Sequence, residues 1–197
     1  SAGDVESFRK KTTYLDSDVL AAAGFGKLEI YVSAGFALSE AEKLELAPGT
    51  SLAIIANVSS LNPATFAVDG GVRIAGGAVN FSGAITTFGA GAAIDVSGSW
   101  VNGASGVPPV IKGGSIQVSG QFAEGVVLDV SGGGWYDTSG AKPKLKLGDA
   151  GTISLGVADA GQLAGLDLRG YSAASGGSLL ISTDANVRIG GAASGDP

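Results

Sequence analysis

The sequence contains no cysteine, no histidine and no methionine. Without cysteine the chain forms no disulfide, and without histidine it lacks the commonest catalytic base and metal ligand. Charged residues are only 15% of the total, and no apolar run reaches the roughly 20 residues of a membrane-spanning helix. Backbone pairing and core packing therefore have to hold the chain together, and we expect no membrane span.

Positive charge is also scarce. The formal net charge is −6, with 18 acidic and 12 basic residues. A nucleic-acid-binding surface would show a basic stripe, but positive charge clusters only at Arg9, Lys10 and Lys11. We therefore expect no nucleic-acid partner. Residues 1–11 are too polar for a signal peptide. Because methionine is absent, we expect the chain to be a segment of a longer protein.

Glycine, by contrast, is abundant. The 197 residues include 34 glycines, and 45% of the residues are hydrophobic, an apolar supply that disordered chains lack. This combination predicts many short strands joined by tight glycine turns. We interpret the glycine pairs as turn formers with positive φ, since none has the aspartate that a calcium-binding repeat requires. The pairs are Gly70-Gly71, Gly76-Gly77, Gly113-Gly114 and Gly176-Gly177.

Short apolar–x–apolar triplets recur through most of the chain. A period of 20–26 residues is too short for a βαβ unit and fits one coil of a solenoid, whose strands stack about 4.8 Å apart. We therefore predict an all-β, right-handed parallel β-helix over residues 28–197. One series of triplets begins at Leu52, Val72, Ile94, Ile116, Leu145, Leu166 and Val187, and a second begins at Val79, Leu128, Ile153 and Leu179.

The alternation within a triplet predicts which residues face the core. Positions i and i+2 share a face of a strand, so the aliphatic members point inward and the middle residue points outward. If the first series forms one stack, Arg73 lies beside Asp95, and Asp167 lies between Lys146 and Arg188. No two like charges are then adjacent, which favours this register.

The same register argues against catalysis by paired carboxylates. It places Asp95 and Asp167 three coils apart, about 14 Å at the usual strand spacing, which is too far for a glycosidase pair. Asp129 belongs to the other series. We interpret these residues as solvated charges and expect no enzyme activity, metal site or cofactor.

An antiparallel β-sandwich is the alternative fold. Asp69-Gly70 and Asn102-Gly103 are the dipeptides that hairpin turns prefer. Hairpins do not explain the recurrence at about 21 residues, however, so the repeat favours the parallel coil.

Residues 1–27 differ from the repeat and predict an extension with a short capping helix. Asp16 or Ser17 is a suitable N-cap for a helix over residues 18–23, which Gly24 closes. Such a helix covers strand edges that a solenoid end would otherwise expose. The residues expected to cover the end are Val19, Leu20 and Phe25.

The longest interval between triplets contains residues 132–144, which we predict to be a loop insertion. Pro143 and two lysines indicate that this loop is exposed. Trp135 and Tyr136 on it either pack structurally or form a platform for sugar rings or a partner protein. Trp100 and Phe122 are expected to stack on each other in the core or over a corner.

Five segments, taken in order, carry a resemblance to a known family. They are YLDSDVLAAAGFGKLEIYV (14–32), AAIDVSGSWVNGA (92–104), GVVLDVSGGGWYDTSG (125–140), KLKLGDAGTISLG (144–156) and LRGYSAASGGSLLIST (168–183). Together they resemble the filamentous haemagglutinin-like passengers of two-partner secretion systems. Asn62-Pro63 does not match the signature of that family's amino-terminal secretion domain, so the resemblance indicates a shaft segment.

The resemblance implies a large β-helical protein at the bacterial cell surface, acting in adhesion or biofilm formation. Its partners would be an outer-membrane pore during export and glycans or proteins of host or bacterial surfaces. We therefore expect a non-enzymatic structural or adhesive segment. The alternatives are a carbohydrate-binding or carbohydrate-active β-helix, and a filament subunit that assembles end to end through open coil ends.

Overall fold

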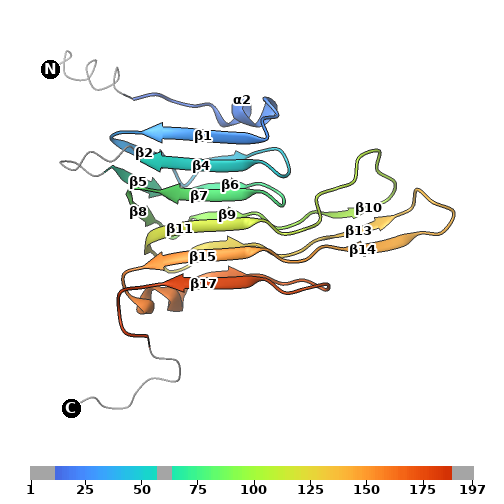
Figure 1. Ribbon diagram of the computed structural model, residues 1–197. Coiled ribbons are helices and arrows are strands. Elements are labelled where there is room, and N and C mark those ends of the chain that lie inside the picture. The colour runs from blue at the N-terminus through green and yellow to red at the C-terminus, as the bar shows by residue number, and fades with distance from the viewer. Residues whose placement is uncertain (1–11, 57–63, 188–197) are drawn as a thin grey trace.

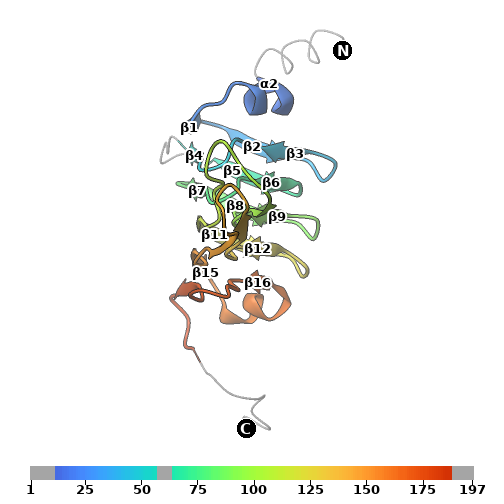
Figure 2. The ribbon, with the colours of Figure 1, turned by 90° about the vertical axis from the view of Figure 1, so that its right-hand side faces the viewer.

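The chain winds as a stack of coils in a computed structural model that describes residues 12–56 and 64–187. Strands of successive coils lie side by side and run in the same direction (Figure 1). Each full coil passes through three faces, which we call A, B and C. Faces A and C lie on opposite sides of the stack when it is viewed along the arm that projects from it (Figure 2). The predicted all-β fold with parallel strands is confirmed.

Face A is the longest ladder. Its inward positions stack Leu52 and Ile54 on Val79 and Phe81 of the next coil. The same pattern continues through every pair of this face, because alternate residues point to the core. The strands are β1 (Lys27–Val32), β4 (Ser51–Ala56), β7 (Ala78–Ser82), β11 (Ser115–Phe122), β15 (Thr152–Val157) and β17 (Ser178–Ser182).

Face B is shorter. β11 bends from face A to face B: residues 115–120 pair with β15, residues 115–117 also pair with β7, and Gln121 and Phe122 pair with β8. Between β15 and face C, the 3-10 helix η1 (Ala160–Gly165) stands where the other coils have a strand. The other strands of face B are β2 (Gly35–Leu38), β5 (Thr65–Val68) and β8 (Ile85–Phe88).

Face C has the shortest strands, and in four of its five strands one buried side chain lies between two exposed or half-exposed ones. Ile94 stacks between Val72 and Leu128. The strands are β3 (Lys43–Glu45), β6 (Gly71–Arg73), β9 (Ala93–Asp95), β12 (Val127–Asp129) and β16 (Asp167–Arg169).

The predicted single stack of triplets is wrong. Val72 and Ile94 are neighbours on face C as expected, but Ile116 lies on face A and pairs with Val79. The first series mixes triplets from faces A and C with one from the projecting arm. On the coil, the first and third residues of the described triplets are buried or pack against the core as the alternation predicts, except Leu179 and Ile181 of β17, which are about half exposed. The triplet that begins at Val187 extends beyond the described residues.

The coils are also less uniform than predicted. Paired residues are 20 apart at the shortest step, from Phe66 to Thr86, and 24 apart from Leu28 to Leu52. The step lengthens to 37 residues from Val79 to Ile116 and again from Ile116 to Ile153. The extra length projects sideways between face C and face A, so the coil itself keeps its register.

Phenylalanines form a ladder through the core. Phe88 stacks on Phe122 with ring centroids 4.7 Å apart and an interplanar angle of 3°. Phe81 lies on the other side of Phe88 at 6.1 Å, and Phe66 packs edge-on against Phe81. The predicted stacking of Phe122 with Trp100 is wrong, because Trp100 lies outside the coil.

Glycines line the corner where each coil enters face A. The residue after the corner donates its N–H to the corner residue of the previous coil, for example Ser115 to Gly77 at 2.9 Å and Thr152 to Gly114 at 3.0 Å. The second coil has Thr50 instead, buried, with its hydroxyl donating to the carbonyl of Phe25 at 2.9 Å. The corner residues are Gly26, Thr50, Gly77, Gly114, Gly151 and Gly177.

At Gly77, Gly114 and Gly151 the corner needs glycine because the coils approach closely, and not because of a positive φ. Of the four predicted turn-forming pairs, only Gly76 has a positive φ, at 60°. A Cβ on Gly114 would lie 1.8 Å from the carbonyl oxygen of Gly77, and one on Gly113 would lie 1.9 Å from the carbonyl oxygen of Val130. The expectation of positive φ at these pairs is therefore wrong except at Gly76.

The short helix α2 (Ser17–Ala22) lies at one end of the stack, against β3 (Figures 1 and 2). Asp16 is its N-cap and accepts from the N–H of Asp18 at 2.9 Å, and Gly24 follows with φ of 66°, as predicted. Only Leu20 packs against the core, while Val19 and Phe25 are exposed, so the expected cover from these two residues is wrong.

Candidate functional site

A side arm projects from the corner between faces C and A (Figure 1). It consists of residues 99–112 and 132–149 and contains β10 (Trp100–Asn102), β13 (Gly134–Asp137) and β14 (Lys144–Leu147). β10 and β13 are parallel, whereas β13 and β14 form an antiparallel hairpin. This is the one antiparallel pair in the described ranges, so the sandwich alternative is wrong. The predicted loop at 132–144 is largely this hairpin.

One face of the arm carries aromatic and aliphatic side chains. Trp100, Gly134 and Leu147 form one row across the three strands, and Asn102, Tyr136 and Leu145 form the next. Trp100 is 69% exposed, Tyr136 45% and Leu145 60%. We call this surface the arm face. It is an exposed, largely apolar sheet surface with an amide and a phenol among its members.

The indole of Trp100 lies across the backbone of Gly134. A Cβ on Gly134 would meet three atoms of the indole ring at 2.6–3.1 Å, so only glycine leaves room for the ring there. The ring is therefore held against the sheet on one side while most of the residue stays exposed. The predicted position of Trp100, in the core or over a corner, is wrong, because the sequence did not reveal that its strand lies in the arm.

Trp135 is on the opposite face of the arm and is only 5% exposed. Its indole N–H donates to the carbonyl of Gly103 at 2.9 Å, and the ammonium of Lys146 lies 4.0 Å from its ring centroid. An exposed platform that includes Trp135 is therefore wrong. Tyr136 is exposed as expected, and Trp100 is the aromatic neighbour that lies near it on the arm face.

A hydrogen-bonded turn closes the arm hairpin. The carboxylate of Asp137 accepts from the hydroxyl of Ser139 at 2.6 Å, from the N–H of Ser139 at 3.0 Å and from Lys146 at 3.0 Å. These contacts lower the pKa of Asp137 to about 2, with the Ser139 hydroxyl as the largest cause. The ionised carboxylate therefore holds the end of the arm in shape.

The arm is expected to loosen in acid. A carboxyl whose pKa is depressed in the folded state contributes its full stabilisation above its unfolded pKa, near 4, and loses it as the pH falls toward 2. Amide hydrogen exchange within 134–147 should therefore accelerate from pH 4 to pH 2, after correction for intrinsic rates. Asp137→Asn should remove this dependence, and an unchanged pH profile in that variant would contradict the assignment.

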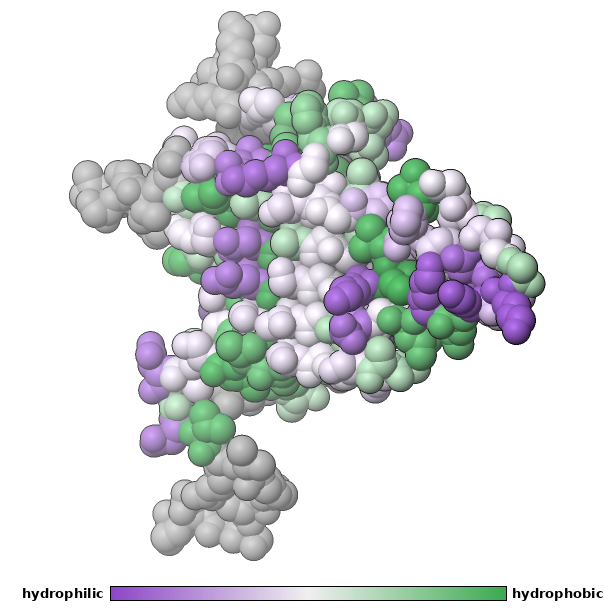
Figure 3. Space-filling model, turned by 45° about the vertical axis from the view of Figure 1, so that its right-hand side comes forward, coloured by the Kyte–Doolittle hydropathy of each residue, from purple (hydrophilic) through white to green (hydrophobic). Residues whose placement is uncertain are grey.

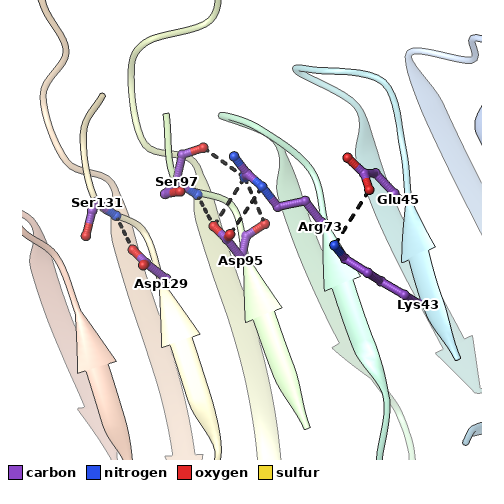
Figure 4. Close-up of polar contacts among 7 residues, drawn as sticks. All are labelled: Lys43, Glu45, Arg73, Asp95, Ser97, Asp129 and Ser131. Carbon is purple, nitrogen blue, oxygen red and sulfur yellow. Dashed lines mark hydrogen bonds and ion pairs between the residues drawn. The ribbon is translucent and has the colours of Figure 1, made fainter. Parts of the chain in front are cut away.

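Face C carries a row of charges along the coil axis (Figure 4). Glu45, Arg73, Asp95, Asp129 and Arg169 occupy equivalent positions on neighbouring strands. The predicted pairing of Arg73 with Asp95 is confirmed, with Nε 3.1 Å from Oδ2. The rest of the predicted row is wrong, because Asp95 neighbours a like charge, Asp129.

Asp167 is also placed differently from the prediction. It pairs with Val127 across the strands, and Arg169 of its own strand donates to its carboxylate, which lowers the pKa of Asp167. Lys146 lies on β14 of the arm, where it pairs with Trp135 across the strands, and Arg188 lies outside the described residues.

The motif Asp-Val-Ser-Gly explains why the like charges are tolerated. It occurs at residues 95–98 and 129–132, and in each copy the aspartate accepts from the N–H of the serine two residues later, at 2.9 and 2.8 Å. Asp95 is also bound by Arg73. The repeated motif is a signal of equivalent positions that the sequence contained and the triplet pattern did not use.

No group of three or more acidic side chains within residues 12–56 and 64–187 is placed to hold a metal ion. None of the helices described there has the length and apolar character to cross a membrane. The cluster Arg9–Lys11 lies outside the described residues.

The chain was compared with protein-family models, with curated proteins and with solved structures. None of the three comparisons gave a match. The side arm and the charge row of face C are therefore interpreted from their own geometry.

Proposed function

We propose that the chain is a non-enzymatic structural and adhesive segment of a large, secreted, filamentous haemagglutinin-like protein at the bacterial cell surface. The observation that carries this proposal is the combination of an in-register parallel coil with an arm that projects from it. The coil supplies length and stiffness, and the arm face supplies exposed aromatic surface away from the coil. Right-handed winding is part of the proposal, because crossovers between parallel strands of one sheet are almost always right-handed.

The contacts between coils support the role of a stiff structural shaft. Backbone hydrogen bonds, stacked aliphatic side chains and the phenylalanine ladder connect each coil to its neighbours. Such quasi-one-dimensional packing extends by adding coils without changing the cross-section. The absence of cysteine agrees with a chain that passes a pore unfolded and folds outside, which is how the resembled family is exported.

End-to-end association stays a prediction. The exposed strand β17 favours such association, because its Leu179, Leu180 and Ile181 are about half exposed. A hydrophobic patch is visible near the lower end of the stack (Figure 3). At the opposite end, α2 lies over β3 and occupies part of the surface that a second stack would need.

A carbohydrate-active enzyme is the second candidate, because Asp95 and Asp129 occupy neighbouring strands in register. Strand spacing puts their backbones about 5 Å apart, which is within reach of a retaining glycosidase pair. Both carboxylates are engaged, however: Asp95 by Arg73 and Ser97, and Asp129 by Ser131. They also lie on an outward sheet face. These contacts favour a structural role for the two aspartates.

Incubation with a panel of polysaccharides distinguishes the two candidates. A structural and adhesive segment should be retained on some members of the panel and release no new reducing ends or unsaturated sugars. An enzyme should release products, and Asp129→Asn should stop their release while leaving the melting temperature nearly unchanged. Product formation that depends on Asp129 would overturn the proposed function.

A further inference from the structure

The lysines at the end of the arm differ from the other cations of the described chain. Within residues 12–56 and 64–187, every lysine and arginine except Lys142 and Lys144 forms an ion pair with a carboxylate. Both exceptions are exposed and lie at or beside the start of β14. The paired cations are Lys27, Lys43, Arg73, Lys112, Lys146 and Arg169.

The unpaired charge stands out because the whole chain is acidic. The chain has 18 acidic and 12 basic residues, so carboxylates outnumber the cations that could pair with them. Two exposed lysines without a carboxylate partner are therefore unexpected. Lys144 lies opposite Asp137, but Asp137 pairs with Lys146 instead. The outer part of the arm therefore presents positive charge that its own carboxylate does not neutralise.

The arm face beside these lysines is flat and polar enough to hold a sugar ring. The indole of Trp100 lies across Gly134 with its outer side uncovered by the sheet, which suits stacking against the C–H face of a pyranose. Asn102 and the hydroxyl of Tyr136 share this face and can exchange hydrogen bonds with sugar hydroxyls. Lys144 precedes Leu145 on β14, so its side chain leaves the strand on the face opposite the arm face, and its ammonium group reaches the arm face around the edge of β14.

The size of the arm face argues against a folded protein as the ligand. Three strands at about 4.8 Å spacing make a surface about 10 Å wide, enough for one or two sugar rings. A stable protein interface needs about 800 Å² on each partner. A membrane is disfavoured by the order of side chains along the arm, since hydrophilic residues gather at its outer end and hydrophobic ones lie closer to the coil (Figure 3).

We propose that the arm face binds an acidic polysaccharide, with a sugar ring stacked on Trp100 and its carboxylate or sulfate groups paired with Lys142 and Lys144. This inference rests on the proposed adhesive function and specifies the ligand class of its contact surface. The flexible four-carbon stems of the lysines let their ammonium groups reach an anion on either side of the edge strand β14.

The test uses three hexasaccharides and the full 197-residue chain. Hyaluronan carries carboxylates, chondroitin sulfate carries carboxylates and sulfates, and chitohexaose in its fully N-acetylated form is neutral. At low salt, calorimetry should show both acidic chains binding about tenfold more tightly than chitohexaose. Trp100→Ala should weaken binding of all three about tenfold. The double variant Lys142→Gln/Lys144→Gln should reduce the acidic chains to the affinity of chitohexaose and leave chitohexaose unchanged.

Matched controls separate the arm from general effects of charge and aromatic content. Lys27→Gln/Lys43→Gln makes the same change in net charge on β1 and β3, and Tyr31→Ala removes an exposed aromatic residue from β1. Both controls should bind all three hexasaccharides as the parent chain does. Equal melting temperatures of the variants confirm that each still folds.

Several outcomes would overturn the inference. Equal affinity for acidic and neutral chains, or equal losses in the control variants, would remove the assigned role of the two lysines. Capture by phosphatidylserine vesicles that depends on these lysines, without hexasaccharide binding, would assign the arm to membranes. If the protein is retained on polysaccharides and Trp100→Ala does not reduce that retention, this inference is contradicted and the adhesive function is not. If no polysaccharide retains the protein, both are contradicted.

Discussion

Replacing Gly114 by alanine is expected to destabilise the coil by about 4 kcal/mol or more, an effect in the exceptional range for one substitution. The added Cβ would lie 1.8 Å from the carbonyl oxygen of Gly77 and 2.8 Å from its carbonyl carbon. These are backbone atoms of the neighbouring coil, so no side-chain rotation relieves the clash. The two coils would have to separate, and the hydrogen bond from Ser115 to Gly77 would be lost.

Gly26 offers a matched control for this prediction. It occupies the same corner position in the first described coil, and a Cβ added there meets no atom within 4 Å. Gly26→Ala should therefore leave the urea midpoint unchanged or raise it slightly, because alanine has fewer unfolded conformations. If Gly114→Ala and Gly26→Ala gave the same midpoint, the close approach of the coils would not be what selects glycine at this corner.

Removing the ring of Phe88 should have the second-largest effect, about 3–5 kcal/mol, the usual cost of truncating a buried phenylalanine. Phe88 is 0% exposed, and its ring stacks between those of Phe81 and Phe122. Phe88→Ala leaves a cavity that these rings, fixed to separate coils, fill only in part. Chemical denaturation should show the loss, and hydrogen exchange should show it first in β8 and β11.

Phe25→Ala is the corresponding control. Its side chain is 59% exposed, so the substitution should change the free energy of unfolding by no more than about 0.5 kcal/mol. A similar small change for Phe88→Ala would mean that the aromatic ladder contributes little to holding the coils together.

The fold class could be predicted from the sequence, but the order of stacking could not. Alternation within a triplet depends only on strand geometry, so Leu52 and Ile54 were correctly placed inside. Ile94-Asp95-Val96 and Ile116-Gln117-Val118 have the same pattern yet lie on different faces. The arm insertions lengthen two coils. The near-constant spacing between triplets therefore led us to pair strands that are not neighbours in the structure.

The candidate site was predicted only in part, for a related reason. Residues 132–144 were expected to be exposed, and Tyr136 is. The difference between Trp100 and Trp135 depends on which face of a small sheet each occupies, and that depends on the pairing of β10 with β13. Strands 34 residues apart in the chain set this pairing, and neither local composition nor loop signals encode it.

The corner between faces C and A shows how such a protein can change without losing its shape. Residues 99–112 and 132–149 leave the coil and return to it there, and Ile116 still pairs with Val79 as though the intervening residues were absent. Segments of other length or composition, placed between Gly98 and Gly113, would be displayed on the outside while the coils above and below kept their pairing. One scaffold could in this way carry many different surfaces.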